Sequence, residues 1–371
     1  MNAALIPTAI RDLPWRVITP ITLLVAFGSA VLYSAAGGNF QPFASSHLLR
    51  YAIFLGMALV MSRVPPDFVK LAAFPVYGAT VVLLLLVEAL GAIGGGSQRW
   101  LAIGPLVLQP SELMKPAIVL VLALFYGRLP PTLIRSWRGL IPAGVLIAVP
   151  MGLVLLQPDL GTALAIAFGG VVVMFLAGLP MRWFVGGGLA GLTIIPIAYF
   201  FVLHDYQRRR VTTFLDPESD PLGAGYHITQ SKIAIGSGGV FGKGFGNGSQ
   251  SHLNYLPEPH TDFVFATMAE EWGLLGGIFV LTIFGLVLKW GIDVARRAPD
   301  RFSMLLAAGM TATIFFYVAI NLMMVMGLAP VVGIPLPFMS HGGSSMMTNM
   351  ICVGTLMMVD RWSRQSPRRL S

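Results

Sequence analysis

Long runs of apolar residues, each about 20 residues in length, recur along this chain and leave few architectures open to it. A run of that length can cross a bilayer as a helix, in which every backbone polar group finds a partner within the segment. Hydrophobic residues make up 56% of the chain and charged residues only 11%, too little polar surface to cover a water-soluble globule. We therefore expect an all-α, polytopic membrane protein with ten transmembrane helices, near residues 17–36, 48–64, 68–90, 112–128, 139–156, 162–179, 183–203, 262–289, 302–327 and 341–360.

Lysine and arginine residues gather in alternate gaps between these runs, which predicts the orientation of the chain. Short cytoplasmic loops of membrane proteins carry an excess of basic residues. On one side lie 16 of the 24 basic residues, namely Arg11, Arg16, Arg63, Lys70, Arg128, Arg135, Arg138, Arg182, Lys289, Arg296, Arg297, Arg301, Arg361, Arg364, Arg368 and Arg369. We predict a multi-pass protein of the cytoplasmic (inner) membrane with both termini in the cytoplasm.

The net charge of +8 follows from the same asymmetry. It indicates contact with anionic lipid on the basic side. No basic face is interleaved with aromatic residues, so we expect no nucleic-acid partner.

One long polar segment, residues 204–261, separates the seventh run from the eighth. It is too long for a simple connector, and loops of this length are usually functional or disordered. Its apolar residues argue against disorder. We expect a single membrane domain, residues 1–371, with this segment as a large extracytoplasmic loop between helices seven and eight.

Two features of that loop indicate polar contacts at the membrane surface. The stretch ITQSKIAIGSGG has Ile228, Ile233 and Ala234 at helical spacing around Gln230 and Lys232, which predicts a short amphipathic helix at the interface. The triplet Arg208, Arg209 and Arg210 is either a solvated charge run, the usual case, or an anion clamp for phosphates.

Two common ligand motifs are missing from the loop. In GSGGVFGKGFGNGS, Gly244 follows Lys243 where a phosphate-binding P-loop needs Ser or Thr. The six histidines of the chain all lie on the predicted outer side, but none has the H-E-x-x-H spacing of a zinc site. The sequence thus favours neither a nucleotide site nor a zinc site.

Glu112 and Lys115, in QPSELMK, stand three residues apart at the start of an apolar run and can pair on one helix face. Pro110, Ser111 and Glu112 also have the form of a helix start, with Ser111 as the cap. Lys115 would lie about one turn inside the bilayer, where ionisable groups are costly and usually functional. A structural pair and a functional pair both remain open.

The stretch LPEPHTDFVFATMAEE places four of the 16 acidic residues where the loop enters the eighth run. Asp262 stands at the first turn, where it either caps the helix or has a chemical role. Glu270 and Glu271 lie roughly 12 Å deeper along the axis. Buried acids need partners, so we expect these two to anchor backbone amides or basic groups.

Five motifs closely resemble those of the SEDS family (shape, elongation, division, sporulation): DPESDPLGAGYHITQSKIAIGSGGVFGKG, LPEPHTDFVFATMAEEWG, QRWLAIGPLVLQPSELMK, QPDLGTA and PLPFMSHGGSS. The resemblance extends over nearly all ten runs in the expected order, and DPESDPLGAGY favours the elongation (RodA) branch over the division branch. His341 is a departure, because the family usually has Tyr before GGSS.

The resemblance implies a peptidoglycan glycosyltransferase that polymerises lipid II, onto a lipid-linked glycan chain, on the outer face of the membrane. Such a reaction needs a base for the attacking hydroxyl and cations for the departing pyrophosphate. Asp262 matches the family's essential aspartate and is the expected general base. The expected substrate-binding residues are Arg208, Arg210, Lys115, Glu112, Gln230, Lys232 and Ser344.

The resemblance also implies helpers outside the chain. A divalent cation, Mg²⁺ or Mn²⁺, is a candidate cofactor, and the sequence assigns it no ligands. The expected protein partner is a class B penicillin-binding protein, the transpeptidase of the elongation complex.

Two other functions remain as alternatives. A lipid II flippase would need polar groups in both halves of the membrane, and the inner half of this chain has few. A non-catalytic scaffold for a cell-wall synthase would have no indispensable polar side chain.

Overall fold

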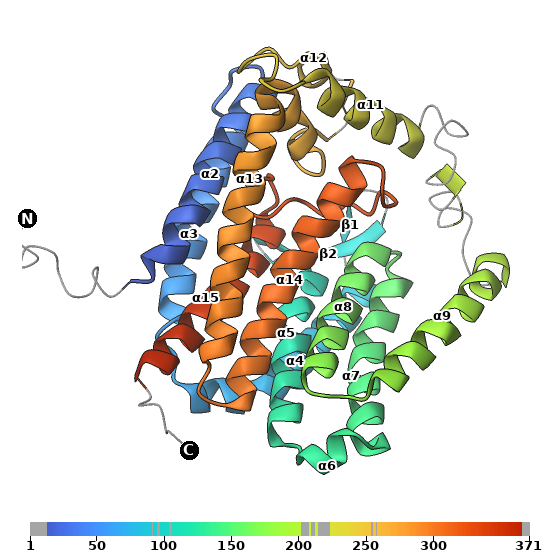
Figure 1. Ribbon diagram of the computed structural model, residues 1–371. Coiled ribbons are helices and arrows are strands. Elements are labelled where there is room, and N and C mark those ends of the chain that lie inside the picture. The colour runs from blue at the N-terminus through green and yellow to red at the C-terminus, as the bar shows by residue number, and fades with distance from the viewer. Residues whose placement is uncertain are drawn as a thin grey trace, which may run out of the picture.

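The computed structural model is a bundle of long helices with a cap of shorter elements at one end (Figure 1). It describes residues 13–90, 92–94, 97–103, 106–201, 208, 212–213, 223–253, 255–256 and 258–365. The described helices are α2 (Trp15–Ala35), α3 (Phe43–Met61), α4 (Pro66–Leu90), α5 (Pro110–Arg128), α6 (Pro131–Ile134), α7 (Trp137–Leu156), α8 (Leu160–Leu176), α9 (Met181–Phe201), α11 (Ala224–Ser237), α12 (Ser249–His252), α13 (Val264–Arg297), α14 (Arg301–Val325) and α15 (Gly343–Gln365).

Each of the ten predicted spans overlaps one long helix of the bundle. Seven of the described helices, namely α2, α3, α4, α5, α7, α13 and α14, are long and apolar enough to cross a membrane, and α8 is apolar but only 17 residues long. The chain is therefore a helical, multi-pass membrane protein, as the apolar runs predict.

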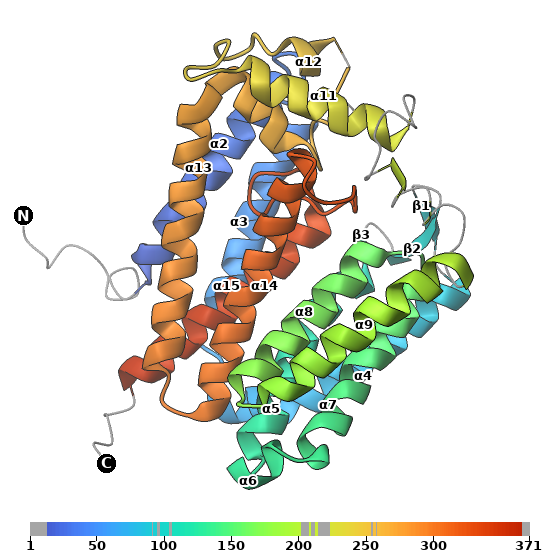
Figure 2. The ribbon, with the colours of Figure 1, turned by 45° about the vertical axis from the view of Figure 1, so that its right-hand side comes forward.

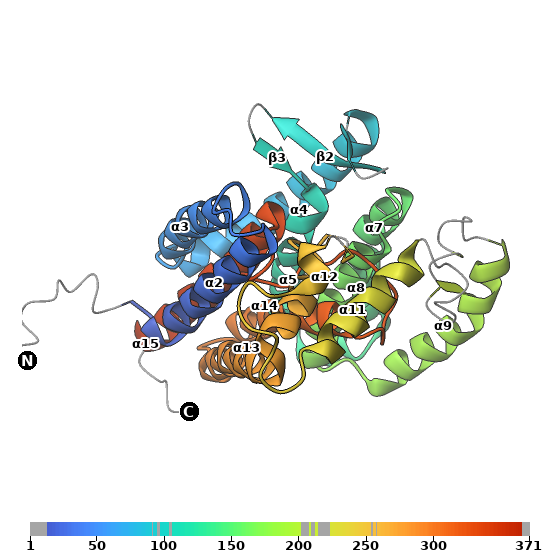
Figure 3. The same ribbon diagram turned by 90° about the horizontal axis from the view of Figure 1, so that it is seen from above.

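Helices α5 and α14 lie near the centre of the bundle (Figure 3). Of the 19 residues of α5, 14 are buried, and the helix packs against α4, α8 and α14. Small residues permit this close packing: a Cβ added to Gly309 of α14 would come within 2.5 Å of Val119 on α5 and 2.8 Å of Val173 on α8. Close backbone approach of this kind is the usual basis of helix association in lipid.

A small antiparallel sheet lies between α4 and α5 and was not predicted. Its strands β1 (Ala92–Gly94), β2 (Ser97–Ile103) and β3 (Leu106–Leu108) pair in the order β1-β2-β3. Gly94 pairs with Ser97 and Ile103 with Leu106, so the chain folds back twice within 17 residues, 92–108.

The two ends of the bundle differ in composition. The loop end has α11, α12 and residues 326–342, whereas the basic end has α6 and the termini of helices that carry Arg128, Arg297, Arg301 and Arg364. Figure 2 shows α11 lying across the loop end, above α13 and α14. The predicted amphipathic helix is thus present as α11, but its buried face holds Ile228, Ser231 and Ala234, while Ile233 is exposed, contrary to the prediction. The reason is that Ser231 donates a hydrogen bond to the carbonyl of Val325 (2.7 Å), which turns that side of α11 inward.

Helix α13 is broken at Gly273, which has φ 60° and ψ −155°. Residues 239–244 of the loop fill the break with four backbone hydrogen bonds. The amides of Lys243 and Gly244 donate to the carbonyls of Glu270 and Glu271 (2.9 and 3.0 Å), and the amides of Leu274 and Leu275 donate to those of Gly239 and Val240 (2.9 and 3.3 Å). These bonds replace helical ones at a depth where an unpaired backbone group is costly.

Glu270 holds the same loop through its side chain, as predicted, whereas Glu271 ties α13 to α2. Glu270 is fully buried and accepts from the Nζ of Lys243 (2.6 Å), the hydroxyl of Ser249 (2.9 Å) and the amide of Gln250 (3.1 Å). Glu271 accepts a hydrogen bond from Ser34 of α2. The two acids deep in the eighth predicted span are therefore structural anchors.

The break at Gly273 generates a stability prediction. In Gly273→Ala the new Cβ would lie 2.4 Å from the amide nitrogen of Gly242 and 2.7 Å from the carbonyl oxygen of Val240, in a backbone conformation that essentially only glycine adopts. We expect a loss of about 1–3 kcal/mol or more, seen as a clear drop in the unfolding temperature of the detergent-solubilised protein. Gly285→Ala in the same helix meets no atom within 4 Å and should melt like the wild type. Equal melting of the two variants would contradict this account.

Candidate active site

Asp262 lies just before α13 at the loop end of the bundle. The N-cap of α13 is Phe263, and no side-chain hydrogen bond caps the helix there. The side chain of Asp262 therefore does not cap α13. Its carboxylate faces the segment between α14 and α15, where a Cβ on Gly333 would lie 3.5 Å from its Oδ2.

Four hydrogen bonds connect the backbone around Asp262, the segment 326–342 and α14 with one another. Asn321 of α14 donates from one amide nitrogen to the carbonyls of Asp262 (2.9 Å) and Ile334 (2.7 Å). In the loops themselves, the hydroxyl of Ser340 donates to the carbonyl of Thr261 (2.6 Å), and the amide of His341 donates to the carbonyl of His260 (2.8 Å). Asp262 is thus fixed by contacts to its neighbours' backbone, which leaves its carboxylate available for chemistry.

Burial raises the pKa of Asp262 to about 6, and the negative charge of Glu258 adds to the increase. Part of the side-chain surface still meets solvent. At neutral pH the carboxylate is mostly ionised, and its affinity for a proton is far above that of an ordinary aspartate. A general base works best with a pKa near the operating pH, so these are properties that acid–base catalysis requires.

A histidine cluster borders this segment. The ring of His260 stacks on Phe43 of α3 with centroids 3.8 Å apart, and Arg50 of the same helix lies 3.1 Å from the Nε2 of His341. Burial, then the Arg50 charge, lowers the pKa of His341 to about 4, and burial lowers the pKa of His260. His341 is therefore neutral at pH 7 and its Nε2 accepts from Arg50, a part that the oxygen of the tyrosine usual in the family could also play.

Glu112 and Lys115 form a buried triad with Tyr317 of α14. The Nζ of Lys115 lies 2.6 Å from Oε1 of Glu112 and 2.7 Å from the hydroxyl of Tyr317, and that hydroxyl donates to the other carboxylate oxygen. Lys115 is 1% exposed and Tyr317 fully buried. The predicted pairing of Glu112 with Lys115 is present, and its enclosure favours the structural reading over direct contact with substrate.

Three further predicted site residues lie on two helices, α11 and α15. Lys232 and Gln230 are on α11, whose His227 ring lies 6.2 Å from that of Phe263, the residue after Asp262. Lys232 is exposed and lies against Gly327, where an added Cβ would come within 2.4 Å of its Cε. Ser344 is buried in the first turn of α15.

The two arginines expected to contact phosphate remain predictions. Arg208 is half-buried. Arg210 lies outside the described residues.

Sequence reasoning missed Asn321, Tyr317 and Arg50. Asn321 and Tyr317 had a usable signal, because each is a polar group inside an apolar run and they stand four residues apart on one face of α14. Their partners could not be identified, since the carbonyls and the ion pair they bind come from segments distant in the sequence.

The described residues do not form a closed metal site. Within that part of the chain, three or more His, Cys, Asp or Glu side chains nowhere converge as ligands. Among the described residues, Glu258 is the carboxylate that raises the pKa of Asp262. That part of the chain thus offers no cluster of protein ligands for Mg²⁺ or Mn²⁺, and the divalent cation stays a prediction.

The triad predicts non-additive stability effects. Glu112→Gln and Lys115→Met should each cost about 3–5 kcal/mol in the free energy of unfolding, because each leaves a buried partner without its counter-charge. The double variant should cost less than the sum of the two. Tyr317→Phe, which keeps the ion pair, serves as the milder control. Thermal unfolding of the four variants measures this, and strict additivity would mean that the residues are not coupled.

Comparison with known proteins identifies the family. Over residues 13–365 the chain matches the cell cycle protein family of FtsW, RodA and SpoVE. It is 43% identical to the peptidoglycan glycosyltransferase MrdB of Escherichia coli strain K12, over 93% of this chain and 92% of that protein. It is 39% identical to the stage V sporulation protein E of Bacillus subtilis, over 76% of this chain and 77% of that protein.

Solved structures agree with the sequence matches. A chain from a peptidoglycan synthase complex superposes with a TM-score of 0.80 at 33% identity, covering 96% of this chain and 99% of that chain. The rod shape determining protein RodA of Thermus thermophilus superposes with a TM-score of 0.69 at 30% identity, with the same two coverages. The chain therefore belongs to the FtsW, RodA and SpoVE family, the SEDS proteins that its motifs resemble.

Proposed function

We propose that this chain is a peptidoglycan glycosyltransferase that polymerises lipid II into β-1,4-linked glycan strands during cell elongation. The observation that carries the proposal is Asp262, a carboxylate with a pKa near 6 that α14 and the segment 326–342 hold at the loop end of the bundle. The names of the similar proteins and the family motifs support the reaction type.

In the proposed reaction, the 4-hydroxyl oxygen of the acceptor sugar forms a bond to the anomeric carbon of the lipid-linked chain. Asp262 accepts the hydroxyl proton as that bond forms. The bond from the anomeric carbon to the undecaprenyl pyrophosphate breaks at the same time, and the pyrophosphate leaves with the electron pair. Direct displacement inverts an α-linked donor to a β-linked product, so no covalent glycosyl-enzyme is needed.

Cations near the loop end stabilise the departing pyrophosphate in this proposal. Lys232 is the best placed of the described candidates, because it is exposed and α11 holds it beside the segment that faces Asp262. Arg208 and Arg210, with Gln230 and Ser344, are further candidates for polar contacts to the substrate. Glu112 and Lys115 contribute by fixing α5 to α14 beneath the site.

We infer that all ten long helices cross the inner membrane, with both termini in the cytoplasm and the loop end outside. The positions of the basic residues support this orientation. Cysteines introduced at Ser219 and Ser249 should react with an impermeant thiol reagent in whole cells, and one at Ser366 should not. The native Cys352 is buried and gives little background. Labelling at Ser366 alone would reverse the orientation.

A class B penicillin-binding protein is the proposed partner. The support is the family resemblance together with the similar chain, which forms part of a peptidoglycan synthase complex. Polymerisation assays should therefore include this partner.

Replacing Asp262 tests the catalytic assignment. Asp262→Asn should lower polymerisation of lipid II by about 10²–10⁴-fold, because an amide does not accept the proton. Glu258→Gln is the matched control and should retain most activity at pH 7.

The stability of Asp262→Asn is informative because folding raises the pKa of Asp262 above its unfolded value. The stability associated with that shift is present at low pH and lost as the pH rises through about 6. Asp262→Asn should thus melt at an equal or higher temperature at pH 7.5. Normal polymer from well-folded Asp262→Asn would remove the catalytic claim, whereas a flippase would transport lipid II and form no polymer in any variant.

The pH dependence gives a second test. Because Asp262 must be ionised to act as a base, kcat/KM should fall tenfold per pH unit below about 6. Glu258→Gln removes a like charge and should move this limb to lower pH. His260→Asn should leave the limb in place. If the fall in kcat/KM at low pH is unchanged in Glu258→Gln but absent in His260→Asn, the titrating group is the histidine.

A further inference from the structure

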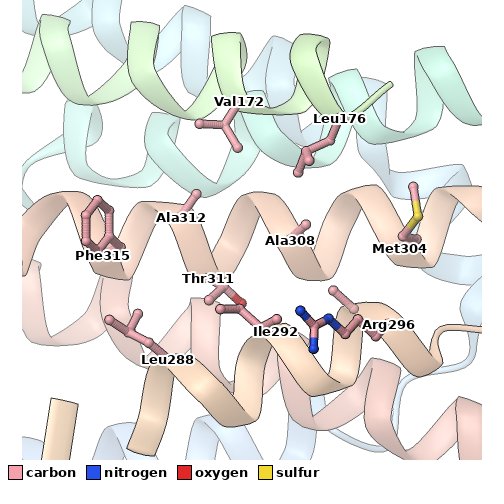
Figure 4. Close-up of a pocket in the computed structure, with 11 residues that line it drawn as sticks. Val172, Leu176, Leu288, Ile292, Arg296, Met304, Ala308, Thr311, Ala312 and Phe315 are labelled. Carbon is pink, nitrogen blue, oxygen red and sulfur yellow. The ribbon is translucent and has the colours of Figure 1, made fainter. Parts of the chain in front are cut away.

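An apolar groove opens between α8 and α13 on the side of α14, in the half of the bundle toward the basic end (Figure 4). Its volume is about 490 Å³, within the range typical of ligand pockets. The walls include Val172 and Leu176 of α8, Leu288 and Ile292 of α13, and Ala308 and Phe315 of α14. Leu176, Ile292 and Phe315 are each more than 40% exposed, so the groove is open to the lipid phase along its length.

The residues that line the groove offer almost no polar groups. Its one hydroxyl, on Thr311, donates to the carbonyl of Ala307 within α14 (2.8 Å). A water-filled groove would lack partners on these walls. A hydrocarbon chain is the occupant that such a surface favours.

Arg296 supplies a charge at one end of the groove. Figure 4 shows its side chain on α13, beside Ile292 and at the end where Met304 lies. Among the described residues Arg296 makes no ion pair, while the arginines around it are engaged. Arg297 bonds the carbonyl of Asp293 and pairs with Asp360 at 3.9 Å, and Arg301 donates to the carbonyl of Ala177 after α8.

We propose that this groove is a binding site for an anionic phospholipid of the leaflet at the basic end. One acyl chain lies along α14 between α8 and α13, and the phosphate contacts the guanidinium of Arg296. Basic pockets between transmembrane helices are known to hold anionic lipid headgroups, and an arginine fork matches phosphate geometry. An anionic lipid is favoured over a neutral one because the apolar groove can take an acyl chain and Arg296, at its end, can bind the phosphate.

The site is separate from the proposed chemistry. Asp262 lies at the loop end of the bundle, whereas Arg296 is next to the last residue of α13, at the far end of the roughly 35 Å of helix that follows the break at Gly273. A lipid whose headgroup reacts at Asp262 cannot also place its phosphate at Arg296. The proposed ligand is thus a membrane phospholipid and not the polyprenyl-linked substrate.

Native mass spectrometry of the detergent-solubilised protein, titrated with phosphatidylglycerol or phosphatidylcholine, tests the site. Arg296→Gln should weaken phosphatidylglycerol binding about five-fold and leave phosphatidylcholine unchanged, because only the charge is lost. Arg297→Gln removes the same charge one residue away and should change either affinity by less than two-fold. Ala312→Phe, which fills the groove without altering charge, should weaken both lipids. Thermal unfolding of each variant confirms that it is folded.

Two outcomes would overturn the proposal. Equal phosphatidylglycerol affinity in wild type and Arg296→Gln would mean that the lipids bind as a non-specific annulus. Displacement of phosphatidylglycerol by an equal or lower concentration of undecaprenyl phosphate would reassign the groove to the polyprenyl lipid. Neither readout depends on polymerisation, so failure here is distinguishable from failure of the proposed function.

Discussion

The amide of Asn321 is the interaction on which the loop end of this protein depends. Its nitrogen donates to the carbonyls of Asp262 and Ile334, so a single buried side chain of α14 joins the entry to α13 with the segment before α15. Neither segment is regular at that point, and irregular backbone buried in a membrane protein needs partners from elsewhere in the fold. Without the amide, two carbonyls would lose their donor, and the position of the Asp262 carboxylate would no longer be fixed.

The same face of α14 organises the layer beneath. Tyr317, one turn from Asn321, bonds both members of the Glu112 and Lys115 pair on α5. α14 therefore presents two polar side chains to the interior: Asn321 binds backbone carbonyls, and Tyr317 binds the ion pair of α5. Small residues such as Gly309 let α5 and α8 approach α14 closely. Specific polar contacts at this end and close packing below explain how one central helix can position residues that are far apart in the sequence.

The helical architecture and the location of Asp262 could be predicted from the sequence, because apolar length and local charge are local properties. The interaction of loop residues 239–244 with α13 could not, since it depends on backbone hydrogen bonds between segments about 30 residues apart. Ile233 was assigned to the wrong face of α11, because the hydrogen bond from Ser231 to Val325 outweighs one apolar side chain in setting the helix rotation. The short sheet was missed for a related reason: three- to seven-residue strands in a glycine-rich stretch give too weak an alternating pattern.

The break at Gly273 has a mechanical consequence. The nine residues 264–272, about 13 Å of helix, are bonded at their far end to the loop and begin two residues after Asp262, whereas the long remainder of α13 is packed among α2 and α14. The loop is bonded on both sides of Gly273, to Glu270 and Glu271 before it and to Leu274 and Leu275 after it. It therefore acts as a splint across the break, which fixes the short piece that begins beside Asp262 relative to the membrane-embedded remainder of α13.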